Sequence, residues 1–382
     1  MEYNFDEIVI HARTGLNPRK NFILGKGNNR YITIKNIKNN SLVIDDNTDF
    51  IDDEAVDMIH KRSQIKKGDI LFASIGRFGD TYIIEEEPTG WDINESVFAF
   101  TVNEKLIRQK YFHYLFKHKE TIRQLTKNSS GSTFKSIKMN QLKKMRFNLP
   151  DLNSQDIIVS LLDCVTNIIS IYEQELLLLD ELVKARFVEM FGDENNSKGW
   201  KIVNIEDVAN VQVGVVIKPS QYYTDQDSGI KAFRSLNIGN GYIKDDDWVY
   251  FSEEGNKKNK KSILSTNDVL VVRSGAPGTA CVVTSEYAGS NAIDVIIAHP
   301  DFQKVDSHYL CTYTNMPHGK SQIIEGTGGA AQQHFNVGKY NKLKLMLPPL
   351  EYQKQYVKFL EEIDKSRLLS NHSLFLIKSL IF

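Results

Sequence analysis

The stretch that decides the fold is Gly68–Gly79, GDILFASIGRFG, because it recurs 199 residues later as Asn267–Gly278, NDVLVVRSGAPG. Each copy has an Asp, then four apolar residues, then a Gly-x-x-Gly segment. Short apolar runs bounded by turn residues are typical of buried strands. We therefore predict strands at 70–73 and 269–272, each followed by a turn that connects strands, not by a loop that cradles phosphate.

Two further segments recur in the same order. The polar loop at Gly131 has its counterpart at Gly329, and residues 149–155 (LPDLNSQ) correspond to 347–353 (LPPLEYQ), both at an offset of 198. A period near 200 indicates a domain duplication, not a solenoid of short repeats.

Each copy has two parts. About 150 residues of short strands and helices, with helices expected at 110–116 and 307–313, are followed by one long helix. We predict an α/β (α+β) architecture of two similar mixed domains with pseudo-two-fold symmetry, separated by two long helices packed as an antiparallel coiled coil. The expected parts are a first domain at 1–150, a central helical region at 151–193, a second domain at 194–348 and a C-terminal helical region at 349–382.

The long helices carry an apolar seam. In a helix predicted from 155 to 190, apolar residues step by threes and fours through nine of ten positions, and the C-terminal helix continues the same frame. Asn153 or Ser154 is expected to cap the first helix and Gly192 to end it. The alternative is that each helix is buried against its own domain. The residues expected in the coiled coil or against a partner are Ile158, Leu162, Val165, Ile169, Tyr172, Leu176, Leu179, Val183, Leu360, Ile363, Leu374 and Ile377.

Charge is unevenly distributed along the chain. The formal net charge is −1, which argues against a uniformly basic nucleic-acid binder. Residues 1–150 nevertheless carry 24 basic and 19 acidic side chains (+5), whereas 151–193 carry 2 and 9 (−7). Because exposed charges act over about a Debye length, ~10 Å at 0.1 M salt, a local positive face remains compatible with these numbers. We expect the acidic helix to face protein partners and to stand off from DNA.

The composition predicts a cytoplasmic protein. Hydrophobic residues make up 41% and charged residues 25%, as in globular proteins. No run approaches the roughly 18 uninterrupted apolar residues of a membrane span, and the acidic start does not resemble a secretory signal. The three cysteines, Cys164, Cys281 and Cys311, have no C-x-x-C spacing, so neither a disulfide framework nor a zinc site is expected.

No catalytic constellation stands out. The segment 148–151 (NLPD) departs at two positions from the Asn/Asp-Pro-Pro-aromatic loop of amino-methyltransferases, and Gly326–Gly329 lacks the Gly-Lys-Ser/Thr of a phosphate-binding loop. His113 and His118 lie five apart, unlike the i, i+4 pair of a helical zinc site. We predict no catalytic and no metal-binding residues, and favour a binding protein over an enzyme.

Polar and basic loop residues are the candidates for DNA contacts. The two copies match in their apolar framework and differ in these loops, as a reader of two different half-sites would require. Each candidate could instead be an ordinary surface residue. The candidates are Arg77, Lys127, Asn128, Lys135, Arg273, Gln332 and Gln333.

These segments resemble a known family. The two Leu-Pro motifs and Leu179–Asp193 (LDELVKARFVEMFGD) are similar to the specificity subunit of type I restriction–modification systems, and the duplicated organisation covers essentially the whole chain. The resemblance implies two target-recognition domains that each read half of a bipartite double-stranded DNA site. It also implies two helical regions that dock two methyltransferase subunits.

Catalysis would then belong to partner subunits. These would methylate adenine with S-adenosylmethionine and, where restriction subunits are present, cut DNA with ATP and Mg²⁺, so that no cofactor is expected in this chain. Asp151 departs from the family's second proline, a change expected to matter little. Two other classes stay open: a self-contained DNA methyltransferase or nuclease with an unrecognised site, and a coiled-coil scaffold that does not touch DNA.

Overall fold

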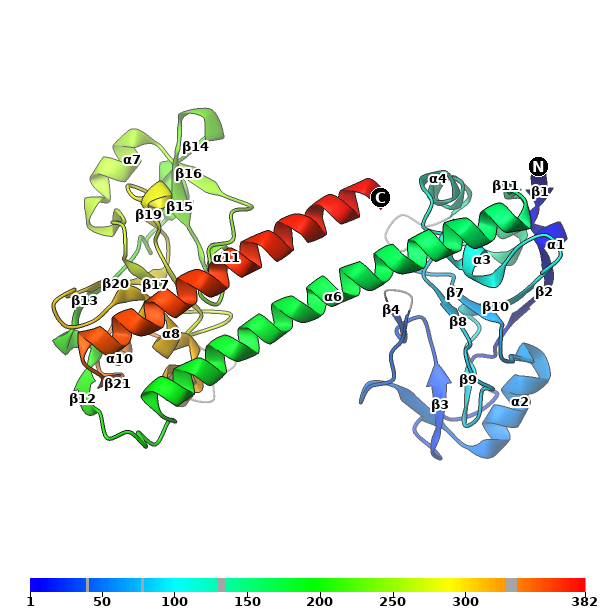
Figure 1. Ribbon diagram of the computed structural model, residues 1–382, viewed down its shortest axis with the longest axis horizontal. Helices are drawn as coiled ribbons and strands as arrows, with labels where there is room; N and C mark the ends of the chain where they lie inside the picture. The colour runs from blue at the N-terminus through cyan, green and yellow to red at the C-terminus, as the bar shows by residue number, and fades with distance from the viewer. Residues whose placement is uncertain (39–40, 77–78, 130–134, 328–334, 382) are drawn as a thin grey trace. The chain divides into compact units, whose positions relative to one another are not determined.

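The computed structural model describes residues 1–38, 41–76, 79–129, 135–327 and 335–381 (Figure 1). The chain forms two compact units, of which the first comprises Met1–Tyr172 with Ser373–Phe382 and the second Glu173–His372. Each unit thus contains one of the expected α/β domains and parts of both long helices. The four-part division drawn from the sequence stays a prediction.

The first unit is built on a four-stranded antiparallel sheet with strand order β2-β10-β7-β8. A smaller sheet has order β6-β3-β9, with β3 parallel to β9, and two short antiparallel pairs are β1-β11 and β4-β5. The strands are β1 (Glu2–Asn4), β2 (Val9–Thr14), β3 (Asn29–Ile32), β4 (Ile37–Lys38), β5 (Ser41–Leu42), β6 (Asp49–Ile51), β7 (Ile70–Ala73), β8 (Thr81–Ile83), β9 (Trp91–Ile93), β10 (Val97–Val102) and β11 (Arg146–Asn148). The short helices are α1 (Phe5–Ile8), α2 (Asp53–Ser63), α3 (Gln109–Leu115), α4 (Lys119–Asn128) and α5 (Met139–Leu142).

The second unit repeats this plan with a sheet of order β13-β20-β17-β18, a second sheet of order β14-β16-β15-β19 and the pair β12-β21. Its strands are β12 (Lys201–Asn204), β13 (Ala209–Val213), β14 (Tyr223–Thr224), β15 (Ile230–Phe233), β16 (Val249–Phe251), β17 (Val269–Val272), β18 (Ala280–Val282), β19 (Asn291–Ala292), β20 (Val295–Pro300) and β21 (Lys344–Leu347). The short helices are α7 (Glu253–Lys258), α8 (Ser307–Asn315), α9 (Pro317–Thr327) and α10 (Val337–Asn341). Short 3-10 turns lie at Ile205–Asp207, Pro219–Tyr222, Gln226–Ser228, Ser235–Asn237, Lys260–Ser262 and Ser285–Tyr287.

The duplication expected from the sequence is confirmed by the strand order. β2-β10-β7-β8 matches β13-β20-β17-β18, and β6-β3-β9 matches β16-β15-β19 with one parallel pair in each. The predicted strands are β7 and β17, with the predicted boundaries. The predicted short helices are α3 and α8, with boundaries that differ by at most two residues.

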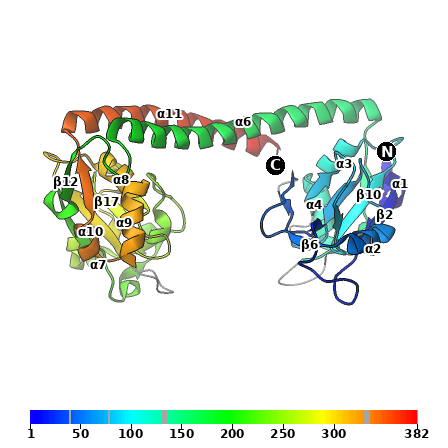
Figure 2. The same ribbon diagram turned by 90° about the horizontal axis from the view of Figure 1, so that it is seen from below.

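Both faces of each four-stranded sheet are covered, which explains the continuous apolar runs in the sequence. On one face of the first sheet, Phe72 and Phe100 pack with Phe112 of α3, and on the other Leu71 packs with Ile93 of β9. All four residues of β7 are buried, as are all four of β17. Figure 2 shows α8 and α9 lying against the corresponding sheet of the second unit. A strand buried on both faces has no alternation of polar and apolar residues.

A buried glutamine joins each long helix to its domain. The side chain of Gln155 accepts a hydrogen bond from the Arg108 N–H (2.9 Å) and donates to the carbonyls of Leu106 (2.9 Å) and Pro150 (3.0 Å). Both Gln155 and its counterpart Gln353 have no exposed surface. In the second unit Gln353 makes the same three bonds, to the backbone of Lys304, Asp306 and Pro348. The repeated Leu-Pro motif therefore encodes a junction between strand, helix and loop.

The two long helices are α6 (Leu152–Phe191) and α11 (Leu350–Ile381). The 40 residues of α6 give a length of about 60 Å at ~1.5 Å per residue. The cap predicted at Asn153 or Ser154 is wrong. Asp151 holds that position, because its carboxylate accepts the Ser154 N–H (3.0 Å), and the helix starts three residues before the predicted residue 155. Gly192, with φ of 91°, follows its last residue as predicted.

The predicted seam is the less exposed side of both helices. All ten seam positions on α6 from 158 to 190 are half-buried, whereas Ile157, Leu161 and Ile171 beside them are more than 60% exposed. On α11, Leu360 and Ile363 are buried. The other seam candidates are half-buried: Ile158, Leu162, Val165, Ile169, Tyr172, Leu176, Leu179, Val183, Leu374 and Ile377.

Within the second unit, the end of α6 packs antiparallel to the start of α11 (Figures 1 and 2). Phe187 and Phe191 contact the ring of Tyr356, with centroid distances of 5.5 and 5.4 Å. Farther along, Asp180 pairs with Arg367. Residue numbers fall on α6 as they rise on α11, so the two helices run in opposite directions here.

Candidate functional site

In the first unit, the Gly-x-x-Gly turn meets the polar loop that follows α4. The Gly76 N–H donates to the Lys135 carbonyl (3.0 Å), and the Ile137 N–H donates to the Ser74 carbonyl (2.9 Å). The fold thus places two segments that are about 60 residues apart in the sequence side by side just beyond the end of β7.

The candidate DNA-contacting residues of the first domain belong to the two segments that meet at this crossing or to α4, the helix that leads to it. Lys127 and Lys135 have exposed side chains, and Asn128, the last residue of α4, is half-buried. Arg77 belongs to the same turn but lies outside the described residues. Contact of any of them with DNA stays a prediction.

In the second unit, Arg273 supports the equivalent crossing. Its backbone carbonyl accepts the Phe335 N–H (3.0 Å), and its guanidinium donates to the Phe335 carbonyl (3.2 Å) and to Asp294 (2.6 Å). The side chain is only 10% exposed. A base contact by Arg273 would require this arrangement to open, and it stays a prediction. Gln332 and Gln333 lie outside the described residues.

The two units support this crossing with different chemistry. Ser74, which occupies the place of Arg273 in the repeat, donates its hydroxyl to the Ser96 carbonyl (2.7 Å). In the first unit the side chain at this position is therefore a neutral hydroxyl, whereas in the second unit it is a guanidinium paired with a carboxylate. The backbone crossing is common to both units, and the side chains around it differ.

The glycines in this region make turns, as predicted. Gly275 and Gly278 have φ of 86° and 85°, in the left-handed region that side chains with a Cβ disfavour. A Cβ on Gly278 would also lie 2.9 Å from Ile323 of α9. The turn joins the paired strands β17 and β18 and packs closely on the helix.

Two buried acids that the sequence interpretation left without a role anchor the sheet. Asp69 accepts a hydrogen bond from Arg13 of β2 (2.6 Å), and its counterpart Asp268 bonds to His299 of β20 (2.6 Å). The signal was present in the sequence, because both acids precede the first apolar residue of the repeated strand. The acid is the same in both units and its partner differs. The framework position is therefore shared, and the polar group that satisfies it is not.

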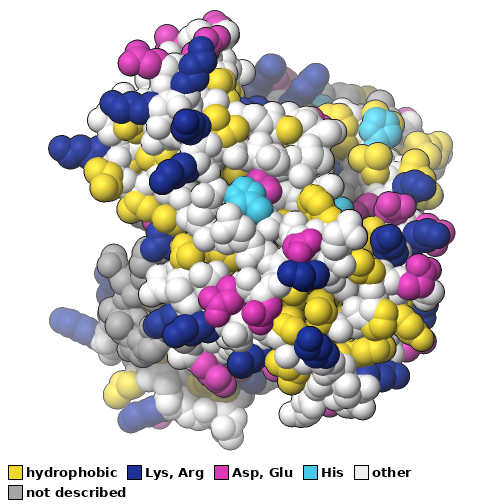
Figure 3. Space-filling model, turned by 90° about the vertical axis from the view of Figure 1, so that its left-hand side faces the viewer, with side chains coloured by type: hydrophobic (Ala, Val, Ile, Leu, Met, Phe, Trp, Pro, Cys, Tyr) yellow, Lys and Arg dark blue, Asp and Glu magenta, His cyan; other side chains and the backbone are white. Residues whose placement is uncertain are grey.

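Basic side chains gather at the end of α7 in the second unit. Figure 3 views the molecule from the left-hand side of Figure 1. Lys and Arg side chains lie on the upper part of this view, at the level of α7 in Figure 1. Lysines on such a turn can neutralise phosphates, which position a nucleic acid without reading its sequence. The exposed residues of this turn are Lys257, Lys258, Lys260 and Lys261.

Within the described parts of the chain, no group of three or more His, Cys, Asp or Glu side chains is placed to hold a metal ion. Burial raises the pKa of the Cys281 thiol to about 12 and raises that of Cys311 well above its usual range. These two thiols therefore stay protonated and are poor nucleophiles at neutral pH.

The sequence interpretation missed a second apolar stripe on α6. Its members each lie one residue before a seam position, with gaps of seven where Cys164 and Glu175 interrupt the row, and their side chains are 38–63% exposed. By length and composition α6 could cross a membrane, although one such helix is weak evidence for a span. Asp163 in its first half accepts hydrogen bonds from Lys110 and Tyr114 of α3, so this part of α6 packs on protein. The stripe consists of Ile157, Leu161, Ile168, Ile171, Leu178 and Leu182.

The family comparison covers most of the chain. The model for the type I restriction modification DNA specificity domain matches residues 3–180 and again 197–377. A putative type I restriction enzyme MjaX specificity subunit of Methanocaldococcus jannaschii is 24% identical over 78% of this chain and 72% of its own length. The type I restriction enzyme EcoBI specificity subunit of Escherichia coli is 20% identical over 77% of this chain, which spans 66% of that relative.

Solved structures share the fold. The S subunit of a type I restriction–modification system from M. genitalium aligns over 100% of this chain and 93% of its own, with a TM-score of 0.56 and 12% identity. A chain from a structural study of complex assembly and conformational transition in a type I system aligns over 100% and 95%, with a TM-score of 0.62 and 15% identity. With two matched domains, one framework repeated and two long helices, this chain belongs to the family of type I restriction–modification DNA specificity subunits.

Proposed function

We propose that this chain reads the DNA sequence for a type I restriction–modification complex, with each compact unit reading one half of a bipartite site. The observation that carries the proposal is the repeated backbone crossing with different polar side chains in the two units. Ser74 stands in one unit where Arg273 stands in the other, while the strands beneath them keep the same order. Such a pair of frameworks can present different hydrogen-bonding groups to two different half-sites.

We further propose that the exposed stripe on α6 docks the modification subunits. A row of six large apolar side chains along one helix is costly to leave in water, and exposed apolar patches mark sites of association. Residues 151–193 carry a formal charge of −7, which disfavours close approach to DNA phosphates and is compatible with a protein partner. This assigns double-stranded DNA to the two domains and two methyltransferase subunits to the helices.

Catalysis is then proposed to reside in the partners. In this scheme S-adenosylmethionine binds the methyltransferase subunits, and ATP with Mg²⁺ serves restriction subunits where these are present. The complex would act on DNA in the cytoplasm. A labelled S-adenosylmethionine assay tests this division of labour, with methyl transfer expected only after methyltransferase subunits are added. Transfer by the purified chain alone would favour the self-contained enzyme instead.

An exchange of domains tests the reading of half-sites. Residues 194–348 are replaced by the corresponding domain of a relative with a different target, and methylated adenines are mapped in the host genome. One half of the methylated motif should change while the other half is retained. If both halves change, or neither does, the two units are not independent readers.

The docking stripe can be tested separately from DNA recognition. Leu161→Glu and Leu178→Glu are combined, because both side chains are more than 60% exposed and should tolerate the change without loss of folding. Binding of the methyltransferase subunit should weaken at least a hundredfold, at about tenfold or more for each buried leucine. Asn167→Glu, at an exposed position of the same helix, is the matched control and should bind normally. Equal loss in both variants would point to charge and not to the stripe.

A further inference from the structure

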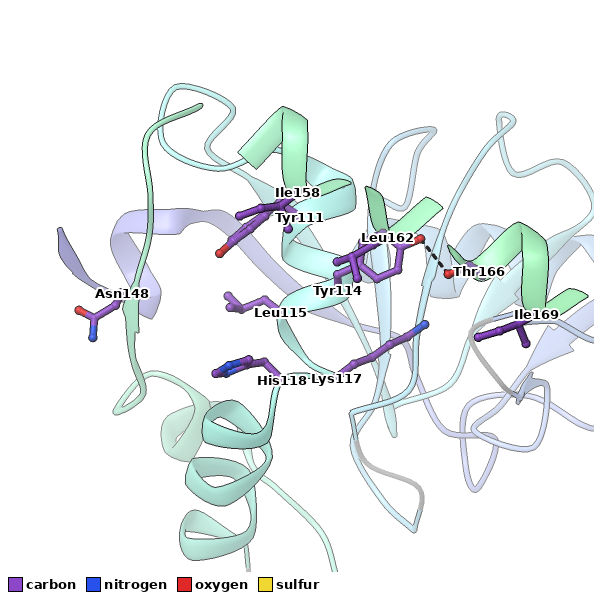
Figure 4. Close-up of a pocket in the computed structure, with 10 residues that line it drawn as sticks. All are labelled: Tyr111, Tyr114, Leu115, Lys117, His118, Asn148, Ile158, Leu162, Thr166 and Ile169. Carbon is purple, nitrogen blue, oxygen red and sulfur yellow. Dashed lines mark hydrogen bonds between the residues drawn. The ribbon is translucent and has the colours of Figure 1, made fainter. Parts of the chain in front are cut away.

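The first unit contains an open groove between α3 and the first half of α6 (Figure 4). Its volume is about 290 Å³. Tyr111 and Leu115 of α3 form one wall, and Ile158 and Leu162 of α6 form the other. Lys117 and His118 also belong to its lining, so the groove combines apolar walls with two basic side chains.

The second unit has the same groove, and there it is filled. The residues equivalent to Tyr111 and Ile158 are Tyr309 and Tyr356, at an offset of 198. Phe187 stacks on Tyr309 (5.8 Å between centroids), and Phe191 packs edge-on against the same ring (4.8 Å). Both phenylalanines come from α6, which runs antiparallel to α11 at this point.

The equivalence of the grooves does not rest on numbering alone. Gln124 of α4 exchanges two backbone hydrogen bonds with Arg146, and Gln322 of α9 exchanges the same two with Lys344. Gln322 lies 198 residues after Gln124, and Lys344 lies 198 residues after Arg146. The helices and strands around the two grooves are therefore in register, and the occupant of one groove indicates what the other accepts.

The size of the open groove agrees with two aromatic rings. A cavity of roughly 150 Å³ in a protein core holds one benzene molecule. About 290 Å³ is thus near the space that two phenyl rings need. Two phenylalanines four residues apart lie on one face of a helix, so a single helix can deliver both.

We propose that the groove of the first unit binds a helix of a partner protein that presents phenylalanine at positions i and i+4, antiparallel to α6. The exposed stripe of α6 supports this source, because Ile157 and Leu161 immediately adjoin the groove residues Ile158 and Leu162 along the helix. A partner seated on the stripe could therefore insert a neighbouring helix. Acidic residues beside the phenylalanines would suit the basic lining residues Lys117 and His118. The inference extends the proposed docking role of α6 and adds a second, separate contact to it.

A peptide with the sequence of residues 179–192, LDELVKARFVEMFG, is the probe, because this segment fills the groove of the second unit. Fluorescence anisotropy is measured as the labelled peptide is titrated with the full chain. We expect saturable binding that weakens at least tenfold when the peptide carries Phe187→Ala and Phe191→Ala, since each ring would lose its buried surface. Absence of binding, or equal binding of both peptides, would overturn the proposal.

Two variants of the full chain place the binding in the groove. Ile158→Asp puts a charge on its wall and should abolish peptide binding, whereas Ser160→Asp, exposed on the same turn, should leave it unchanged. Thr166→Trp, at an exposed position of the lining, should block the groove without disturbing the core and so provides a second test. Binding that survives both groove variants would overturn the proposal.

The same variants distinguish a partner from a second copy of this chain. If light scattering shows a dimer that Ile158→Asp converts to a monomer, the groove belongs to self-association and the proposed partner is wrong. The peptide assay contains neither DNA nor a methyltransferase. Its failure would therefore leave the proposed reading of half-sites intact, and the domain exchange would still decide that question.

Discussion

The first and second units have one backbone plan and two sets of buried polar groups. Asp92 and His113 in the first unit stand where the second has Asn291 and Cys311. Ile93 beside Asp92 and Phe112 beside His113 stay apolar in the second unit, as Ala292 and Leu310, and the glutamine junction is the same. The comparison teaches that packing and backbone hydrogen bonds constrain the shared positions, whereas polar groups are free to diverge wherever a new partner can satisfy them.

The largest effect is expected at the junction that the two units share. Gln155→Ala or Gln353→Ala leaves one N–H and two carbonyl groups without partners in a buried place. Each such loss costs about 1–3 kcal/mol, so we expect a fall of about 3 kcal/mol or more in unfolding free energy. Urea unfolding measures it, with Gln174→Ala on the exposed side of α6 as the control. A large effect in one unit alone would break the equivalence of the two junctions.

A smaller effect should follow replacement of the buried amide Asn291 by the acid that the first unit has at the equivalent position. The Asn291 amide donates to Asn256 (2.7 Å), and its oxygen accepts the Ser262 hydroxyl (2.7 Å), so Asn291→Asp loses a donor and buries a charge. We expect a loss of about 2–3 kcal/mol at pH 7. The loss should shrink as the pH falls towards 4, because burial raises the pKa of the new carboxyl and favours its protonated form. Urea titrations at pH 7 and pH 4 measure it, and an effect independent of pH would refute the role of charge.

The histidine in the first unit should make its stability depend on pH. Burial lowers the pKa of His113 from 6.5 to about 4, while its ring bonds to Thr81 (2.8 Å). The stabilisation is complete above the unfolded pKa of 6.5 and is lost as the pH falls towards 4. Between pH 7 and pH 5 the first unit should lose about 2 kcal/mol. Hydrogen exchange in α3 and α8 at both pH values separates the units, and His113→Cys, which copies the second unit, should remove this dependence.

The smallest effect is expected from Asp92→Asn, which gives the first unit the amide found in the second. Burial raises the pKa of Asp92, partly offset by hydrogen bonds that include the Ile93 N–H (2.7 Å) and His60 (3.2 Å). An acid whose pKa is raised by folding destabilises the fold once the pH exceeds its unfolded value, so Asp92→Asn should stabilise the first unit at pH 7. Thermal unfolding measures the gain. A loss of stability at pH 7 would show that the pairing with His60 outweighs burial of the charge.

The sequence predicted most of the framework because its signals are local or periodic. The apolar runs at 70–73 and 269–272 became strands, and the seam from 158 to 190 became the half-buried side of α6. The predicted helix cap was wrong by two or three residues, since Asp151, Asn153 and Ser154 are all good caps and only the backbone geometry selects one. The second stripe was missed because a helix with two adjacent apolar faces also satisfies a search for one seam.

The strand-forming runs and the helical period are properties of neighbouring residues, and the repeat appears when the sequence is aligned with itself. The sequence by itself therefore determined the duplicated architecture and the family of this protein. The tertiary structure alone decided which distant groups meet. It placed the Gly76 turn against Lys135, buried Arg273 against Asp294, and put Phe187 and Phe191 into the groove of the second unit while leaving the groove of the first open. The physical reason is that these contacts join residues from about 20 to more than 120 positions apart, and their partners are selected by packing of the whole domain and not by local pattern.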